Sequence, residues 1–106
     1  MNLANLKNFK KGWFIGRFEP TIINTDNFEI AVKRYNAGDY EKSHHHKIAT
    51  EITVIIDGEV EMNGTKYTKD DIITINQNES TDFKCITDVV TVVIKTPSVN
   101  NDKYIN

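Results

Sequence analysis

Hydrophobic and polar residues alternate with a period of two along most of this chain, which indicates β-strands with two different faces. The clearest case is the segment from Phe28 to Lys33, where Phe28, Ile30 and Val32 alternate with their neighbours. Short apolar segments recur at even spacing and predict strands over residues 13–18, 28–33, 51–56, 59–62, 65–67, 72–75, 82–86 and 89–95. Pro20 ends the first of them, as expected near a sheet edge.

The segments between these strands have the composition of turns. Asn63-Gly64 separates two of them, and both residues tolerate the positive φ of a type I′ hairpin. Helical spacing occurs only near the start, where Leu3, Leu6 and Phe9 form one stripe on a short turn. Many short strands without intervening helices predict an all-β fold, an antiparallel sandwich or barrel.

Length and charge limit the classes of function. The chain has 106 residues, which suits one domain without a separate cofactor domain. Its net charge of -2 and the absence of a clustered Lys/Arg stripe argue against nucleic acid or an anionic membrane surface as partner. No signal peptide or membrane span is evident, so we expect a cytoplasmic protein. The single Cys85 cannot form an internal disulfide, and we expect it to be a small buried hydrophobe.

All three histidines are consecutive, at His44, His45 and His46. On an extended segment His44 and His46 point to one side and His45 to the other, so two imidazoles can reach one ion. Glu51 follows a short bend and can supply an anionic oxygen from the next strand. A solvated polar turn is the alternative interpretation of the cluster. An expression tag is disfavoured because the cluster is short and lies inside the chain.

The spacing around the histidines resembles a known family. Gly38-x5-His44-x-His46-x4-Glu51-x6-Gly58 is similar to the first conserved motif of the cupins. The resemblance implies a single cupin-type jelly-roll β-barrel of two antiparallel sheets, with a metal ion near one mouth. It implies a barrel over residues 13–96, a short N-terminal arm over residues 1–12 and a C-terminal tail over residues 97–106.

The second cupin motif is not kept. The places where the family has Gly, Pro, Gly, His and Asn hold Asp70, Asn76, Asn78, Thr81 and Cys85. Thr81 therefore takes the place of the last histidine ligand, although a neutral hydroxyl is a poor ligand. Asp82 is the better ligand type, but on a regular strand it points away from Thr81 and needs a bulge to reach the ion. The expected metal ligands are His44, His46 and Glu51, with Asp82 as a fourth candidate and Thr81 as the aligned alternative.

Two His and one carboxylate leave coordination positions open and suit divalent Fe, Mn, Ni or Zn. One hypothesis is a small enzyme with oxygenase, isomerase or lyase chemistry on a small organic molecule. The other is a non-catalytic small-molecule-binding or sensor module with a structural metal or none. Tyr35, Tyr40 and Arg34 are candidate proton donors that would distinguish the two, and the catalytic residues stay unassigned.

Two expectations concern apolar residues. Trp13, Phe14, Phe18 and Phe28 are expected to build the core, because aromatic side chains dominate core burial. The terminal segments lie outside the expected barrel, and Val99, Tyr104 and Ile105 of the tail are candidate anchors for a homodimer through strand addition. A disordered tail is the alternative.

Overall fold

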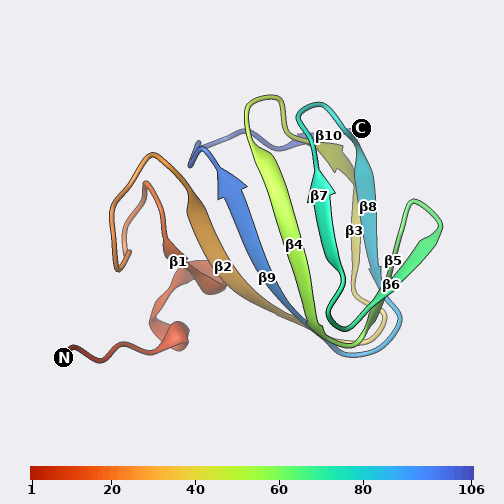
Figure 1. The fold of residues 1–106 in the computed structure, drawn as a ribbon, viewed down its shortest axis with the longest axis horizontal. Coiled ribbons are helices and arrows are strands. Elements are labelled where there is room, and N and C mark those ends of the chain that lie inside the picture. The colour runs from red at the N-terminus through yellow and green to blue at the C-terminus, as the bar shows by residue number, and fades with distance from the viewer.

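The computed structural model describes residues 1–106 as two five-stranded antiparallel sheets that face each other as a jelly roll (Figure 1). The first sheet has the strand order β1 (Trp13–Ile15), β2 (Glu29–Tyr35), β9 (Val89–Thr96), β4 (Thr50–Asp57), β7 (Ile72–Ile75). The second has the order β10 (Tyr104–Ile105), β3 (Tyr40–His45), β8 (Thr81–Cys85), β5 (Glu59–Met62), β6 (Thr65–Thr68). The only helices are two 3-10 turns, η1 (Leu6–Asn8) and η2 (Lys10–Gly12), and no helix is long and apolar enough to cross a membrane.

The all-β architecture predicted from the alternating pattern is confirmed. Strands β5 and β7 have the predicted bounds, and Asn63 and Gly64 have the positive φ values, 49° and 80°, that the hairpin requires. The first strand is shorter than predicted and ends at Ile15. The chain leaves the sheet there because Gly16 adopts φ 154° and its N–H donates to the Thr21 hydroxyl.

The core lies between the two sheets and is mainly aliphatic. Its buried cluster consists of Ile55, Val60, Met62, Ile75, Phe83, Cys85 and Val89, which come from strands of both sheets. Cys85 is buried among them, as expected.

The expectation that Trp13, Phe14, Phe18 and Phe28 form the core is wrong. None of the four is buried, and Phe28 is exposed. The physical reason is position: β1 is an edge strand that pairs only with β2, and the loop after it lies beyond the sheet. An edge strand has a neighbour on one side only, so its aromatic rings are covered on one side only.

The tail folds back onto the barrel instead of leaving it. Tyr104 and Ile105 form β10, which pairs with His45 and His44 at the edge of β3. The ring of Tyr104 also stacks on His45, with ring centroids 5.4 Å apart. This edge of β3 is therefore paired within the chain, and the homodimer stays a prediction.

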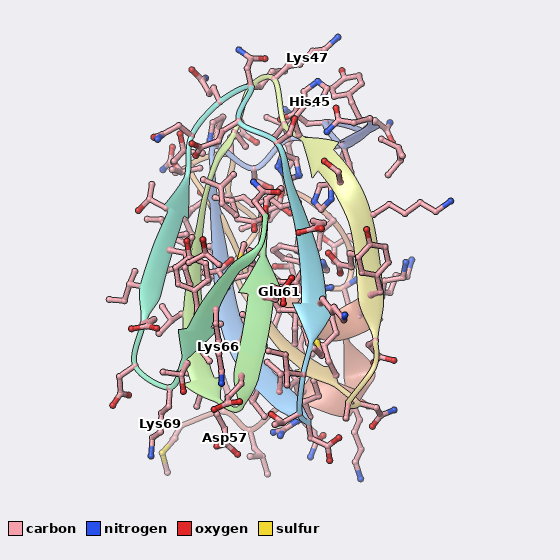
Figure 2. The ribbon with its side chains drawn as sticks, turned by 90° about the vertical axis from the view of Figure 1, so that its right-hand side faces the viewer. His45, Lys47, Asp57, Glu61, Lys66 and Lys69 are labelled. Carbon is pink, nitrogen blue, oxygen red and sulfur yellow. The ribbon has the colours of Figure 1, made fainter.

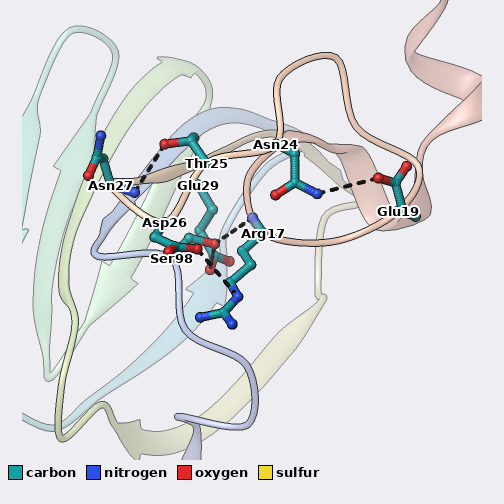
Figure 3. Close-up of polar contacts among 8 residues, drawn as sticks. All are labelled: Arg17, Glu19, Asn24, Thr25, Asp26, Asn27, Glu29 and Ser98. Atoms are coloured by element: carbon teal, nitrogen blue, oxygen red, sulfur yellow. Dashed lines mark hydrogen bonds and ion pairs between the residues drawn. The ribbon is translucent and has the colours of Figure 1, made fainter.

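The loop between β1 and β2 is tied to the start of the tail (Figure 3). Ser98 is buried, accepts a hydrogen bond from the Arg17 N–H at 2.9 Å and donates one to Glu29 Oε1 at 3.1 Å. Arg17 Nε also forms an ion pair with Asp26 Oδ1 at 3.3 Å. These contacts fix the chain segments that flank the strand carrying Trp13.

The glycine at the far end of the motif has a structural explanation. Gly58 has φ 96°, and a Cβ built at this position would lie 2.2 Å from the carbonyl oxygen of Asp88. Only glycine fits where these two backbones meet. Figure 2 shows the neighbouring Asp57 at the end of the barrel opposite to His45 and Lys47, so the motif spans the length of β4.

Candidate functional site

A cavity of about 270 Å³ lies between the sheets near the histidine cluster. Alternate residues of the strands line this cavity, because side chains on one face of a strand recur with a period of two. Examples are Glu51 and Thr53 on β4, and Thr91, Val93 and Lys95 on β9. His44, His46 and Glu51 all line it, so the structure brings the three predicted ligands to one cavity.

The two imidazoles face each other. His44 and His46 are both buried, and their ring centroids are 5.6 Å apart with the rings almost perpendicular. His44 Nδ1 lies 2.8 Å from the carbonyl oxygen of Lys42 and, because a carbonyl can only accept, donates a hydrogen bond to it. His46 Nε2 is buried and has no hydrogen-bond partner. His45 points the other way, onto Tyr104, as the alternation predicted.

The protonation state of His46 follows from its surroundings. Its pKa is lowered to about 4, mainly by burial, with smaller lowering effects from Lys95 and the neighbouring His44 and an opposing effect from Asp102. His46 is therefore neutral near pH 7, which is the state in which imidazole binds metals.

Glu51 shares the cavity but is engaged elsewhere. Its Oε2 accepts a hydrogen bond from the Thr53 hydroxyl at 3.1 Å, and Lys95 is its cross-strand neighbour on β9. No group of three or more His, Cys, Asp or Glu side chains in the chain is arranged to hold a metal ion. The donor chemistry of the two histidines fits a divalent ion, whereas the carboxylate does not complete the ligand set in this arrangement.

The two candidates for a fourth ligand, Thr81 and Asp82, are consecutive residues of β8, so their side chains point to opposite faces of the sheet. Thr81 is buried, lines the cavity and lies directly opposite His44 in the pairing of β3 with β8. Asp82 does not line the cavity, and its Oδ1 instead accepts a hydrogen bond from the Asn63 N–H at 2.7 Å. No bulge at β8 turns the Asp82 side chain inward, so its role as a ligand stays a prediction that would need a rearrangement of this strand.

Only one of the three candidate proton donors reaches the site. Tyr35 lines the cavity and donates a hydrogen bond to Glu41 Oε1 at 3.3 Å. Burial raises the pKa of the Tyr35 phenol, and the Glu41 carboxylate raises it further, so the phenol keeps its proton. Tyr40 and Arg34 are exposed and do not line the cavity.

The sequence reasoning missed the lysines of the site. Lys11, Lys33, Lys95 and Lys103 all line the cavity, from four separate segments of the chain. None of them forms an ion pair, since the two ion pairs of the chain join Arg17 with Asp26 and Lys66 with Glu59. The sequence held one signal for Lys33 and Lys95: they occupy the alternate positions of β2 and β9 whose side chains point into the barrel. Lys11 and Lys103 lie outside the strands, where no periodicity applies.

The segment between His46 and Glu51 is held by the tail. Asp102 is buried, and its carboxylate accepts hydrogen bonds from the backbone N–H groups of Lys47, Ile48 and Ala49 at 2.9–3.2 Å. Burial alone would raise the pKa of Asp102, but these three N–H donors outweigh it and the pKa is lowered. This carboxylate fixes the bend that sets His46 and Glu51 relative to each other.

No protein-family model and no curated protein sequence matches the chain. Solved structures do resemble it. A conserved protein with a double-stranded β-helix domain from Klebsiella pneumoniae has a TM-score of 0.69 and 20% identity, over 76% of this chain and 71% of that one. An RmlC-like cupin from Shewanella frigidimarina has a TM-score of 0.65 and 16% identity, over 73% and 71%.

The DMSP lyase DddQ from Ruegeria pomeroyi is also similar, with a TM-score of 0.73 and 19% identity. The match covers 89% of this chain but 49% of that enzyme, so the chain spans about half its length. At these identities the likeness concerns the fold.

Proposed function

We propose that this chain, which has the cupin fold, binds a small organic molecule in the cavity between its sheets, beside a divalent metal ion held by His44, His46 and Glu51. One observation carries the proposal: two buried imidazoles face each other, and His46 Nε2 has no partner within the protein. Buried polar atoms are rarely left without a partner, so an unpaired nitrogen on a residue that lines a cavity favours a bound group.

The ligand types agree with the metals expected from the sequence. Imidazole suits Fe, Ni and Zn, and a carboxylate adds Mn to this set. When bound, such an ion supplies Lewis-acid polarisation or O₂ chemistry to a neighbouring molecule. To bind the ion, the Glu51 carboxylate must give up its hydrogen bond with the Thr53 hydroxyl. This requires a movement of the Glu51 side chain but not of strand β4.

The chain's own residues supply groups for proton transfer. The Tyr35 phenol keeps its proton and can donate it as a hydrogen bond, while Glu41 accepts from that phenol. Tyr and Glu side chains serve as general acids and bases in enzymes. A lyase is among the proteins that share this fold. Lyase chemistry is therefore one candidate reaction, together with isomerisation and oxygenation.

A second candidate is a non-catalytic binding module without a metal ion. It is favoured by the absence of an assembled three-ligand group and by the cavity lysines, whose positive charges oppose a cation. In this case the imidazoles contact the organic ligand directly.

Metal content separates the two candidates. We would measure Fe, Mn, Ni and Zn by mass spectrometry in untagged protein and in the double variant His44→Ala/His46→Ala. His45→Ala is the matched control, because His45 has the same chemistry and points out of the barrel. Near-stoichiometric metal in the wild type and the control, lost in the double variant, supports the metal site. Protein that stays empty after addition of each metal supports the metal-free module, provided that circular dichroism shows it folded.

A further inference from the structure

We propose that the small molecule bound in the cavity is an organic carboxylate, and that Lys33 and Lys95, beside Trp13, bind its charged end. This inference deepens the proposed function and rests on the cavity being the ligand site. It does not require the metal ion.

The charges of the lining favour an anion. Four lysine ammonium groups line the cavity against the two carboxylates of Glu41 and Glu51. Glu41 accepts a hydrogen bond from Tyr35, and Glu51 accepts one from Thr53, so both carboxylates already have partners. No lysine of the cavity is within ion-pair distance of a carboxylate. Lys33 and Lys95 are partly buried, and a partly buried cation without a counter-charge is costly, so an anionic ligand would offset that cost.

Two of the lysines converge on one aromatic ring. Lys33 Nζ lies 5.0 Å and Lys95 Nζ 5.1 Å from the ring centroid of Trp13. The strand register explains this. Trp13 pairs with Ala31 on β2, and Ala31 pairs with Val93 on β9. Lys33 and Lys95 lie two residues after Ala31 and Val93, so they are on the same face of the sheet as these partners. Cation–π attraction holds each ammonium near the ring but does not neutralise it.

The electrostatic environment of Lys33 agrees with this picture. Burial lowers the pKa of its ammonium group, Glu41 raises it, and Lys95, Lys11 and Lys103 each lower it again. Lys33 thus experiences the other three lysines of the cavity as repelling charges. A bound anion would relieve that repulsion.

The surroundings favour a carboxylate over a phosphate. Phosphate sites commonly use free backbone N–H groups at a helix N-terminus or in a nest. Here the cavity walls are strands whose N–H groups pair within the sheets, and the only helices are two three-residue turns. Val93, Met62 and Phe83 provide an apolar wall. A cavity of about 270 Å³ lies just below the range of about 300–1,000 Å³ that is typical of ligand sites, so it suits a small molecule.

Trp13 is the single tryptophan of the chain, so its fluorescence reports binding at this position. We would titrate the intact protein with propionate, succinate and benzoate, with their neutral amides, and with inorganic phosphate. The double variant is Lys33→Met/Lys95→Met, which removes both charges and keeps most of the side-chain length. Lys84→Met is the control, because Lys84 is exposed on β8 and does not line the cavity. Circular dichroism and urea unfolding confirm that each variant is folded.

At least one carboxylate should bind at least about tenfold more tightly than its amide, and the double lysine variant should lose at least about tenfold in affinity for it. Lys84→Met should stay within about twofold of the wild type. The inference is overturned if no carboxylate outperforms its amide, if phosphate binds more tightly than all three carboxylates, or if the double lysine variant binds as the wild type does. An equal loss in Lys84→Met would also overturn it.

The same titration on His44→Ala/His46→Ala separates this inference from the metal site. Carboxylate binding that depends on the lysines but survives loss of the histidines supports the inference even if the wild type holds no metal. Binding that is lost with the histidines and unchanged in the lysine variant assigns the carboxylate to the metal ion alone, which overturns the inference and leaves the metal site standing.

Discussion

His44 and Thr81 are direct cross-strand neighbours, on β3 and β8. Both are buried and both line the cavity, so Thr81 occupies a place from which a side chain can meet the two imidazoles. The proposed metal site therefore lacks a third imidazole because of one residue, Thr81, in a position that faces His44.

Restoring that imidazole should strengthen metal binding. We expect Thr81→His to raise zinc affinity at least about tenfold, because a third neutral imidazole joins His44 and His46. The measurement is competition with a coloured chelator. Thr74→His on β7, whose side chain is exposed, is the control and should leave affinity unchanged. Unchanged affinity in Thr81→His itself, with the protein folded, would show that β8 does not hold this side chain toward the histidines.

The core prediction compares two isoleucines. Ile55 is fully buried, whereas Ile72 is 67% exposed. We expect Ile55→Ala to lower the free energy of unfolding by about 2–5 kcal/mol, because it removes apolar contacts and leaves a cavity. Ile72→Ala should change it by less than about 0.5 kcal/mol. Urea unfolding measures both, and similar losses in the two variants would contradict the assigned core.

Removal of the Asp102 carboxylate should destabilise the end of the barrel that carries the histidines. Asp102→Ala leaves the N–H groups of Lys47, Ile48 and Ala49 without their acceptor. The expected loss in the free energy of unfolding is about 1.5–3 kcal/mol, the range for hydrogen bonds to a charged group. Asn100→Ala, an exposed residue of the same tail, is the control. Faster amide hydrogen exchange at Lys47, Ile48 and Ala49 would locate the effect, and unchanged exchange there would refute it.

The same carboxylate gives a pH dependence of known sign. Its pKa in the folded state lies below the ordinary value of 3.8, because the backbone N–H donors outweigh the effect of burial. Its stabilisation is therefore fully present above the unfolded-state pKa and is lost as the pH falls through the lower folded-state value. Asp102→Asn should remove this part of the acid destabilisation. Identical slopes of stability against pH below about pH 4 in both proteins would contradict the assignment.

Cys85 should be unreactive in the folded protein. Burial raises the pKa of its thiol from 9.0 to about 11, with Asp39 and Glu41 adding to the shift. Since the thiolate is the reacting species and a more basic thiolate is also more nucleophilic, the pKa alone should slow reaction with an aromatic disulfide reagent near neutral pH by about tenfold, and burial should slow it further. Unfolding in guanidinium chloride should restore the rate. Rapid reaction of the native protein would place Cys85 outside the core.

The sequence by itself determined the features that depend on neighbours along the chain. Alternation of apolar and polar residues identified the strands, and the same period placed His44 and His46 on one face with His45 on the other. Asn63-Gly64 identified its hairpin because positive φ is a local property of these residue types. The spacing of the first motif resembled the cupins, whose fold the structure has.

Tertiary structure decided which side chains meet. Thr81 faces His44, and Lys33 and Lys95 meet at Trp13, because of strand registers set across loops and between distant segments. Periodicity specifies the face of each residue but not its partner on the next strand. The aromatic residues near the start were misplaced for the same reason, since burial depends on a strand's place in the sheet and not on its composition. The tail joined the barrel because Asp102 and β10 found partners that local sequence does not reveal.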